Sequence, residues 1–294
     1  MTYSIVAHDP ETGQLGVAVQ SHWFSVGPIV PWAAPGVGAV ATQANAEVSY
    51  GPRALELLAS GRGAHETLDH LLADDPGAAS RQVAVMDAQG GAAVHTGPEC
   101  IPFAGHAIGE GVCCQANIMA SAAVWPAMLD TFTGAPGSLP ARLLAALDAA
   151  EAAGGDSRGR QSSAMLVVGA EGPAWKSEVN LRVEDHPEPL SELRRLLSVR
   201  EAYRLADRAD HLVGEGRHGE AAKLYRRASE LAPDNHELRF WGGLGAAQSG
   251  DLTLAVAEVR AAIAAHPPWL ELLRKLPAEV APSATTVLAR LQDE

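Results

Sequence analysis

The second residue of the chain is a threonine that directly precedes a short apolar run, Tyr3 to Ala7, typical of a β-strand. Once Met1 is removed, Thr2 carries a hydroxyl nucleophile and a free α-amine, which titrates near pH ~7.7–8.0 and can accept the hydroxyl proton directly or through a water. Methionine removal requires a small second residue, and threonine is small enough. Thr2 therefore combines a nucleophile and a base for amide hydrolysis, although threonine is also a frequent first residue of a strand.

A second group of polar residues lies in the segment GGDSRGRQSS, residues 154–163. Its glycines let the backbone pass close to a ligand, and Asp156 and Arg158 can pair with each other or hold a ligand. Gln161 and Ser162 enter the following strand beside them. A structural ion pair and a substrate contact are equal alternatives for Asp156 and Arg158. Lysine is absent before Lys176, so a cation at an N-terminal site must be an arginine, a histidine or an α-amine.

Composition and motifs exclude several other classes of function. The net charge of -13 argues against a nucleic-acid partner. The histidines form no HExxH motif and no recognisable three-ligand cluster, so we expect no metal. Residues 36–38, GVG, lack the rest of a dinucleotide fingerprint, so we expect no nucleotide cofactor. The cysteines Cys100, Cys113 and Cys114 form no CxxC motif, which favours a reducing compartment.

There is no signal-peptide pattern and no apolar stretch of the ~20 residues that would cross a membrane, so we expect a cytoplasmic protein.

Hydropathy and residue patterning predict a layered α+β domain. Gln115-Ala116-Asn117 is predicted to be an amide-rich turn, which either forms a pocket wall or only satisfies its own polar groups. Strands and helices occur in separate runs, which favours α+β over a doubly wound parallel sheet. Strands are predicted at 3–7, 15–21, 36–43, 82–87, 92–96 and 161–169, and helices at 50–58, 64–73, 121–133 and 139–153.

From about Ser198 the sequence becomes helical in pattern and repeats with a period of 34 residues. This period resembles that of a tetratricopeptide repeat, with inter-helix turns at 216–222 and 250–256, two units over about 200–268, and a capping helix at 269–294. A peptide-binding groove and a helical cover for the first domain are both compatible with two units. The repeated pairs are Gly216/Gly250, Ala221/Ala255, Ala228/Ala262 and Pro233/Pro267.

Five segments of the first 196 residues resemble a bacterial family related to the N-terminal nucleophile (Ntn) hydrolases, domain of unknown function 1028. The segment GGDSRGRQS is the most specific. The resemblance covers about residues 2–196 and implies a four-layer αββα sandwich over 1–196, and the 34-residue period predicts a tetratricopeptide-like helical domain over 197–294. The segments are TYSIVAHDPETGQLGVAVQS, GVGAVATQANAEVSYG, RQVAVMDAQGGAAVHTGPEC, GGDSRGRQSSAMLVV and LRVEDHPEPLSELRRL.

The same resemblance implies roles for individual residues. Thr2 would be nucleophile and base, and the turn at Gln43, Ala44 and Asn45 would offer a backbone N–H to the oxyanion. Ser21 and His22 would orient the amine or contact substrate, or simply end a strand as an exposed polar pair. Arg158 would take the place of the lysine that proteasome-like sites use. The remaining residues expected to contact substrate are Asp156, Gln161 and Ser162.

Two functions follow from these expectations. The first is an amidohydrolase that cleaves a linear amide of a small molecule or peptide through Thr2. The second is a non-catalytic Ntn-fold scaffold that recognises a peptide or cell-wall fragment through its pocket or its helical tail. In either case we expect a homodimer with no membrane partner.

Overall fold

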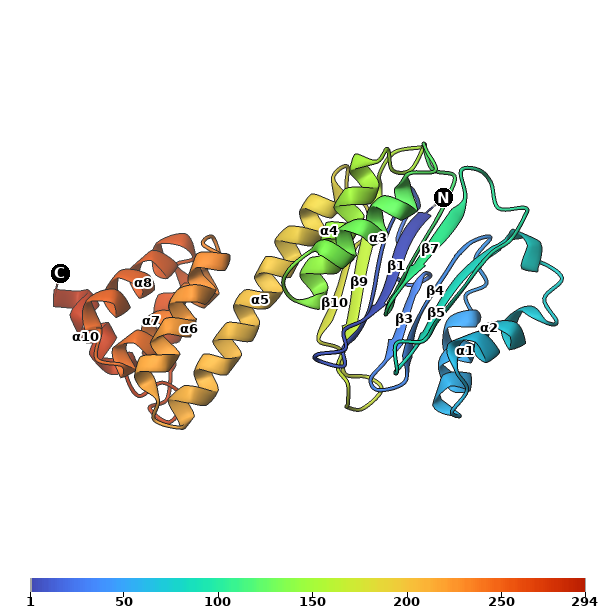
Figure 1. Cartoon of the computed structure of the whole chain (residues 1–294). Coiled ribbons are helices and arrows are strands. Elements are labelled where there is room, and N and C mark those ends of the chain that lie inside the picture. The colour runs from blue at the N-terminus through green and yellow to red at the C-terminus, as the bar shows by residue number, and fades with distance from the viewer. Residues whose placement is uncertain (1, 294) are drawn as a thin grey trace. The chain divides into compact units, whose positions relative to one another are not determined.

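The computed structural model describes residues 2–293, and the chain divides into two compact units, Met1–Arg195 and Leu196–Glu294. The first unit holds all ten strands among the described residues, and the second is helical (Figure 1). Helix α5, Pro189–Gly214, begins in the first unit and ends in the second. Sequence patterning placed the boundary between residues 196 and 197.

Strand β1, Thr2–His8, lies inside a six-stranded antiparallel sheet of order β10-β9-β2-β1-β8-β7. Its first residue, Thr2, pairs with Ser21 of β2 on one side and Asn117 of β8 on the other. Residues Thr2 to Ala7 are all buried, as expected for a central strand covered on both faces. The other strands are β2 Leu15–Ser21, β7 Gly105–Gly109, β8 Val112–Asn117, β9 Ser162–Val168 and β10 Val179–Val183.

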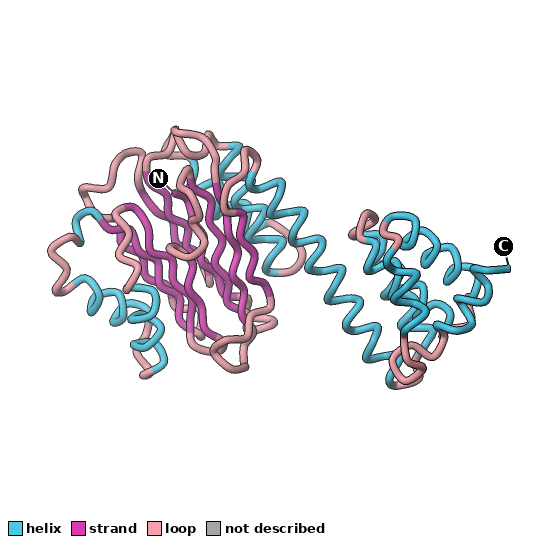
Figure 2. The backbone as a smooth tube through the Cα atoms, turned by 180° about the vertical axis from the view of Figure 1, so that it is seen from behind, coloured by secondary structure: helices cyan, strands magenta, loops and turns pink. Residues whose placement is uncertain are grey.

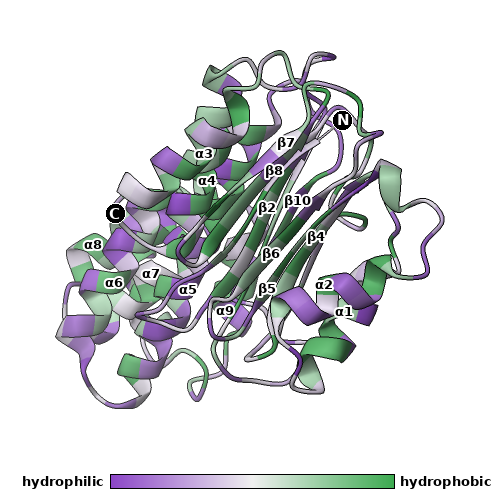
Figure 3. Ribbon diagram, turned by 45° about the vertical axis from the view of Figure 1, so that its right-hand side comes forward, coloured by the Kyte–Doolittle hydropathy of each residue, from purple (hydrophilic) through white to green (hydrophobic). Residues whose placement is uncertain are grey.

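A four-stranded antiparallel sheet of order β3-β4-β5-β6 packs against the six-stranded sheet. Val17 and Val19 of β2 and Ala41 and Met86 of the facing sheet share one buried apolar cluster. Figure 3 shows apolar residues gathered along these strands. The strands are β3 Pro31–Ala34, β4 Gly38–Ala44, β5 Arg81–Asp87 and β6 Ala92–Thr96.

Helices cover the outer face of each sheet. Helices α3 and α4 pack on the six-stranded sheet, and α1 and α2 pack on the four-stranded sheet. Figure 2 shows the strands of the first unit between these helical layers, so the order of layers is helix, sheet, sheet, helix. The helices are α1 Tyr50–Ala59, α2 Ala64–Leu72, α3 Val124–Gly134 and α4 Leu139–Ala152, with a short 3₁₀ helix at Ala78–Ser80.

The structure confirms the α+β class and differs from the sequence-based prediction in several elements. Gln115-Ala116-Asn117 is not a turn but the buried end of β8, because the facing sheet supplies hydrogen-bond partners for both amide side chains. Strands β3, β7 and β10 were not predicted. Helix α3 begins at Val124 and not at Ser121, whose hydroxyl accepts a hydrogen bond from the Ala123 N–H at 3.2 Å in a turn.

The second unit consists of the C-terminal part of α5 and five further helices. Helices α6 and α8 begin at His218 and Leu252, inside the segments predicted as turns, so the turns are shorter than expected. Gly216 and Gly250 have φ values of +75° and +89°, a conformation that glycine adopts without strain. The region predicted as one capping helix contains two. The helices are α6 His218–Leu231, α7 His236–Gln248, α8 Leu252–Ala265, α9 Pro268–Lys275 and α10 Ala284–Asp293.

Residues 2–293 contain neither a helix that could span a membrane nor a metal-binding cluster. None of the helices in this range has the length and apolar character needed to cross a membrane. Within the same range, the His, Cys, Asp and Glu side chains form no group of three that could hold a metal ion.

Candidate active site

Thr2 lies at the end of the central strand of the six-stranded sheet, and only 6% of it is exposed. Its Oγ1 lies 3.0 Å from the Ser21 Oγ, within hydrogen-bond distance. Its carbonyl oxygen accepts hydrogen bonds from the Gln43 Nε2 at 3.1 Å and the Asn117 Nδ2 at 3.4 Å. Both the side chain and the main chain of Thr2 are therefore held in place.

A buried layer of polar side chains lies between the two sheets at the Thr2 end. The Ser4 hydroxyl donates to the Gln43 Oε1 at 2.7 Å, and the Gln43 Nε2 donates to the Gln82 Oε1 at 2.7 Å. The Asn117 Nδ2 also donates to the Gln82 Oε1, at 3.0 Å, while the Gln115 Nε2 donates to the Ala41 carbonyl at 3.0 Å. Three of these bonds, all except that from Gln43 to Gln82, run between strands of different sheets, so they fix the position of one sheet relative to the other at this end.

A cavity of about 290 Å³ opens beside Thr2. Apolar side chains form most of its wall, including Val26, Ile29 and Val30, all in the loop between β2 and β3. Trp23 and Val48 line it and are 56% and 41% exposed. An apolar group can therefore enter from solvent and lie next to the Thr2 hydroxyl. The rest of the lining is Gln43, Ala44, Asn45 and Ala46.

The turn at the end of β4 forms one side of this cavity. Ala44 has a φ of +68°, unusual for a residue other than glycine and found where surrounding structure imposes it. Asn45 is held by Ser80, because its N–H donates to the Ser80 carbonyl and its Nδ2 to the Ser80 Oγ, both at 3.2 Å. The Arg81 Nη1 donates to the Asn45 carbonyl at 2.6 Å. The Ala46 N–H donates to no residue in the described part of the chain.

Arg81 is itself held by a carboxylate. Its Nε donates to the Asp75 Oδ2 at 2.9 Å, and the Tyr50 hydroxyl donates to the same oxygen at 2.6 Å. The hydrogen bonds from Arg81 and then Tyr50 hold the pKa of Asp75 well below its usual range. The side chains of Arg81 and Asp75 are 13% and 12% exposed. The chain of contacts from Tyr50 to Asn45 thus positions the turn from outside the cavity.

Asp156 and Arg158 form an ion pair in the structure. The Asp156 side chain is fully buried and accepts hydrogen bonds from the His22 N–H at 3.1 Å, the Arg158 N–H at 2.9 Å and the Arg158 Nη2 at 3.2 Å. Gly155, at φ +58°, lies against Glu151, so a Cβ there would be 2.8 Å from the carboxylate. The segment is thus tied to the residue that follows β2. The ion-pair alternative describes these contacts, and substrate contact stays a prediction.

Ser162 and Gln161 differ in their relation to the cavity. The Ser162 hydroxyl donates to the Trp23 carbonyl at 2.5 Å and accepts from the Val26 N–H at 3.2 Å, so it holds the loop that forms the apolar wall. Gln161 instead donates from its Nε2 to Asp185 at 3.2 Å and does not line the cavity. Among the described residues, neither Ser162 nor Gln161 forms a hydrogen bond with Thr2.

Sequence reasoning did not connect Thr2 with the polar residues that support it. Ser4, Gln82, Gln115 and Asn117 bond within the layer between the sheets. A signal was present, because Thr2 and Ser4 alternate along one strand and Gln115 and Asn117 along another, which places each pair on one face. These polar residues interrupt strands that are otherwise mainly apolar, which marks them as unusual in the sequence.

The three thiols of the first unit are free and buried. Burial raises the pKa of Cys113 to about 12, and burial also raises the pKa values of Cys100 and Cys114. A thiol of raised pKa supplies little thiolate at neutral pH. The three cysteines are therefore poor candidates for a nucleophile at neutral pH.

Comparison with known proteins identifies the first unit. The model of a family of unknown function, DUF1028, matches residues 2–193. The crystal structure of a DUF1028 protein from Silicibacter pomeroyi is 35% identical, with a TM-score of 0.62, and the match covers 67% of this chain and 84% of that one. No curated protein matches the sequence. The length of the family match and the likeness to a solved member lead to one conclusion, that this chain belongs to the DUF1028 family.

Proposed function

We propose that the chain is an amidohydrolase of the Ntn type, in which removal of Met1 exposes Thr2 as nucleophile and base. One observation carries the proposal: a buried threonine at the start of the central strand places its hydroxyl within 3.0 Å of Ser21 and beside an apolar cavity of about 290 Å³. The order of layers, helix, sheet, sheet, helix, supports an Ntn-like αββα sandwich.

In this mechanism the α-amine of Thr2 accepts the proton of its own hydroxyl, directly or through a water. The Oγ1 attacks the carbonyl carbon of the amide, the C–N bond breaks, and the leaving amine takes the proton. Water then attacks the acyl-enzyme ester and restores the hydroxyl. Ser21 orients the hydroxyl, and the Ala46 N–H, in the turn that lines the cavity, is the candidate donor to the oxyanion.

The wall of the cavity favours a substrate with an apolar group next to the scissile amide. Val26, Ile29 and Val30 provide apolar surface and no charge. Burying apolar surface contributes about 25 cal/mol per Å², so an acyl group with an aliphatic or aromatic chain would bind more tightly than an acidic one.

The experiment has two parts. Intact mass and N-terminal sequencing of protein from its own host should show a chain that begins at Thr2. That protein should then hydrolyse chromogenic anilides with apolar acyl groups, and Thr2→Ala should abolish turnover while Thr2→Ser retains it. A retained Met1, or equal turnover by Thr2→Ala, would overturn the mechanism.

One observation favours the second candidate, a non-catalytic binding protein. Within residues 2–293, no lysine, arginine or histidine side chain hydrogen-bonds the Thr2 hydroxyl. Arg158, the expected substitute for a lysine, pairs with Asp156. Under this alternative Thr2→Ala would bind ligand as the unmodified protein does, and neither would turn over an amide.

We further propose that the second unit is tetratricopeptide-like. Helices α6 and α8 run from 218 to 231 and from 252 to 265, so both their starts and their ends are 34 residues apart. Gly245 of α7 lies against the ring of Tyr225 in α6, and a Cβ at Gly245 would be 2.2 Å from that ring. Helices α6 and α7 therefore approach closely at a small residue. Repeat proteins stack helix pairs in this way.

A further inference from the structure

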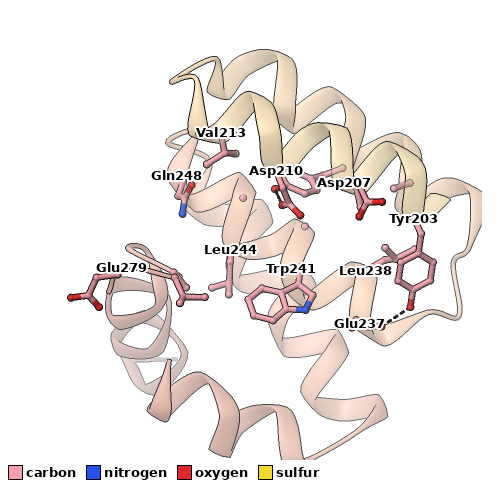
Figure 4. Close-up of a pocket in the computed structure, with 18 residues that line it drawn as sticks. Tyr203, Asp207, Asp210, Val213, Glu237, Leu238, Trp241, Leu244, Gln248 and Glu279 are labelled. Carbon is pink, nitrogen blue, oxygen red and sulfur yellow. Dashed lines mark hydrogen bonds between the residues drawn. The ribbon is translucent and has the colours of Figure 1, made fainter. Parts of the chain in front are cut away.

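The second unit contains a cavity of about 580 Å³, within the range of ordinary ligand sites. Residues of α5, α6 and α7 line it, together with the loop before α10. In Figure 4, Asp207 and Asp210 extend from α5 toward the Trp241 indole of α7, and Tyr203 lies at one end beside Glu237. The cavity thus combines carboxylates with an aromatic face.

The charge of this cavity is of one sign. Its lining includes Asp207, Asp210, Glu237 and Glu279 and contains no lysine, arginine or histidine. Two of the carboxylates accept hydrogen bonds from neutral phenols: Glu237 from the Tyr203 hydroxyl at 2.5 Å, and Asp210 from the Tyr225 hydroxyl. A phenol orients a carboxylate without cancelling its charge.

The carboxylates of the cavity differ from those elsewhere on the same unit. On the outer surfaces, Glu201, Glu220, Glu230 and Glu271 each pair with an arginine three residues away. By contrast, no basic side chain of residues 2–293 lies within 4.0 Å of a cavity carboxylate in an ion pair. Asp207 and Asp210 are also three residues apart on α5, a spacing at which like charges repel.

We propose that this cavity binds a basic peptide segment of a partner protein, with a lysine or arginine side chain over the Trp241 indole and beside Asp207 and Asp210. Tryptophan is the aromatic side chain that attracts cations most strongly, and nearby carboxylates add to that attraction. The volume exceeds what one side chain needs, and Val280, 61% exposed on the rim, offers apolar contact to the adjoining residues of the peptide. The proposal does not depend on Thr2.

The test is fluorescence anisotropy with the full chain and two labelled peptides of equal length, Ac-GRGKRG and Ac-GEGDEG. The basic peptide should bind and the acidic one should not. The double variant D207N/D210N keeps the shape of both side chains and should weaken binding of the basic peptide at least tenfold. Trp241→Phe should weaken it about two- to fivefold, because phenylalanine attracts cations less.

A matched control separates a local site from the attraction of any cation to an acidic protein. The double variant E230Q/D234N removes the same charge from exposed positions of the unit that do not line the cavity, and it should change affinity less than twofold. Equal weakening by both double variants, with unchanged melting temperatures, would overturn the proposal. Analytical ultracentrifugation could also overturn the proposal. If it shows a dimer that does not bind the peptide, the cavity is occupied by a second copy of the chain.

Discussion

The hydroxyl oxygens of Thr2 and Ser21 lie 3.0 Å apart across paired strands β1 and β2. Both residues are buried, and Thr2 also borders the cavity. The proximity restricts the rotation of the Thr2 hydroxyl, as expected if that oxygen must be aimed at a carbonyl carbon.

Ser21→Ala should lower kcat for an amide substrate about tenfold, because a tenfold rate change corresponds to about 1.4 kcal/mol of transition-state stabilisation, the size of one hydrogen bond. KM should change little, since Ser21 does not line the cavity. Steady-state kinetics measures both, and Ser21→Thr, which keeps a hydroxyl, should recover most of kcat. An unchanged kcat in Ser21→Ala would exclude an orienting role.

Gln82→Leu should lower the free energy of unfolding by about 2–5 kcal/mol, because it removes the amide that bonds Gln43 and Asn117 and leaves several buried polar groups unpaired. Urea denaturation measures the loss. Gln89→Leu makes the same substitution at an exposed turn and should change stability by less than about 0.5 kcal/mol. Similar losses in the two variants would contradict a special role for the polar layer.

Asp75→Asn should destabilise the protein at pH 7 by about 1.5–3 kcal/mol, the range for hydrogen bonds to a charged group. The folded-state pKa of Asp75 is lowered, first by Arg81 and then by Tyr50. Its contribution is therefore complete above the unfolded pKa, about 3.9, and is lost as pH falls below that value.

Urea denaturation from pH 7 down to pH 2 measures this dependence. The difference in free energy of unfolding between the unmodified protein and Asp75→Asn should shrink below about pH 4. Asp74→Asn, at the exposed neighbouring position, is the matched control and should leave both stability and its pH dependence nearly unchanged. A gap that stays constant down to pH 2 would contradict a lowered pKa at Asp75.

The three cysteines should resist alkylation in the folded protein. All three are buried, and the raised pKa values of Cys100, Cys113 and Cys114 leave little thiolate. Mass spectrometry after N-ethylmaleimide at pH 7 should show an unmodified chain, and the same treatment in denaturant should add three labels. Rapid labelling of the folded chain would restore a thiol as a candidate nucleophile.

Apolar patterning predicted the strands that begin the chain and those around residues 82–96, because their side chains are apolar and turn residues separate them. Strand β6, Ala92–Thr96, has the predicted bounds. The end of strand β8 was missed, because Gln115 and Asn117 were interpreted as part of a turn. Their burial depends on Gln82 and Ala41, which are distant in sequence and become neighbours only when the sheets pack.

The candidate site was predictable where its residues lie at strand ends. Thr2 and Ser21 come together because paired strands bring their ends side by side, and Gln43 reaches Thr2 from the end of a strand in the facing sheet. The role of Ser162 in holding the Trp23 loop was not predictable, because a hydrogen bond to a backbone carbonyl leaves no pattern in the sequence. The same holds for the contact of Arg81 with the Asn45 carbonyl.

The amide layer between the sheets has a consequence for motion. Apolar contacts are non-directional, so two sheets joined only by methyl groups can slide by small steps. The hydrogen bonds from Ser4 to Gln43 at 2.7 Å and from Asn117 to Gln82 at 3.0 Å instead define one alignment. Local opening must then start at the opposite ends of the strands. The hydrogen-bonded backbone amides of β1 and β8 near Thr2 should accordingly exchange with deuterium more slowly than those at the opposite ends of the same strands.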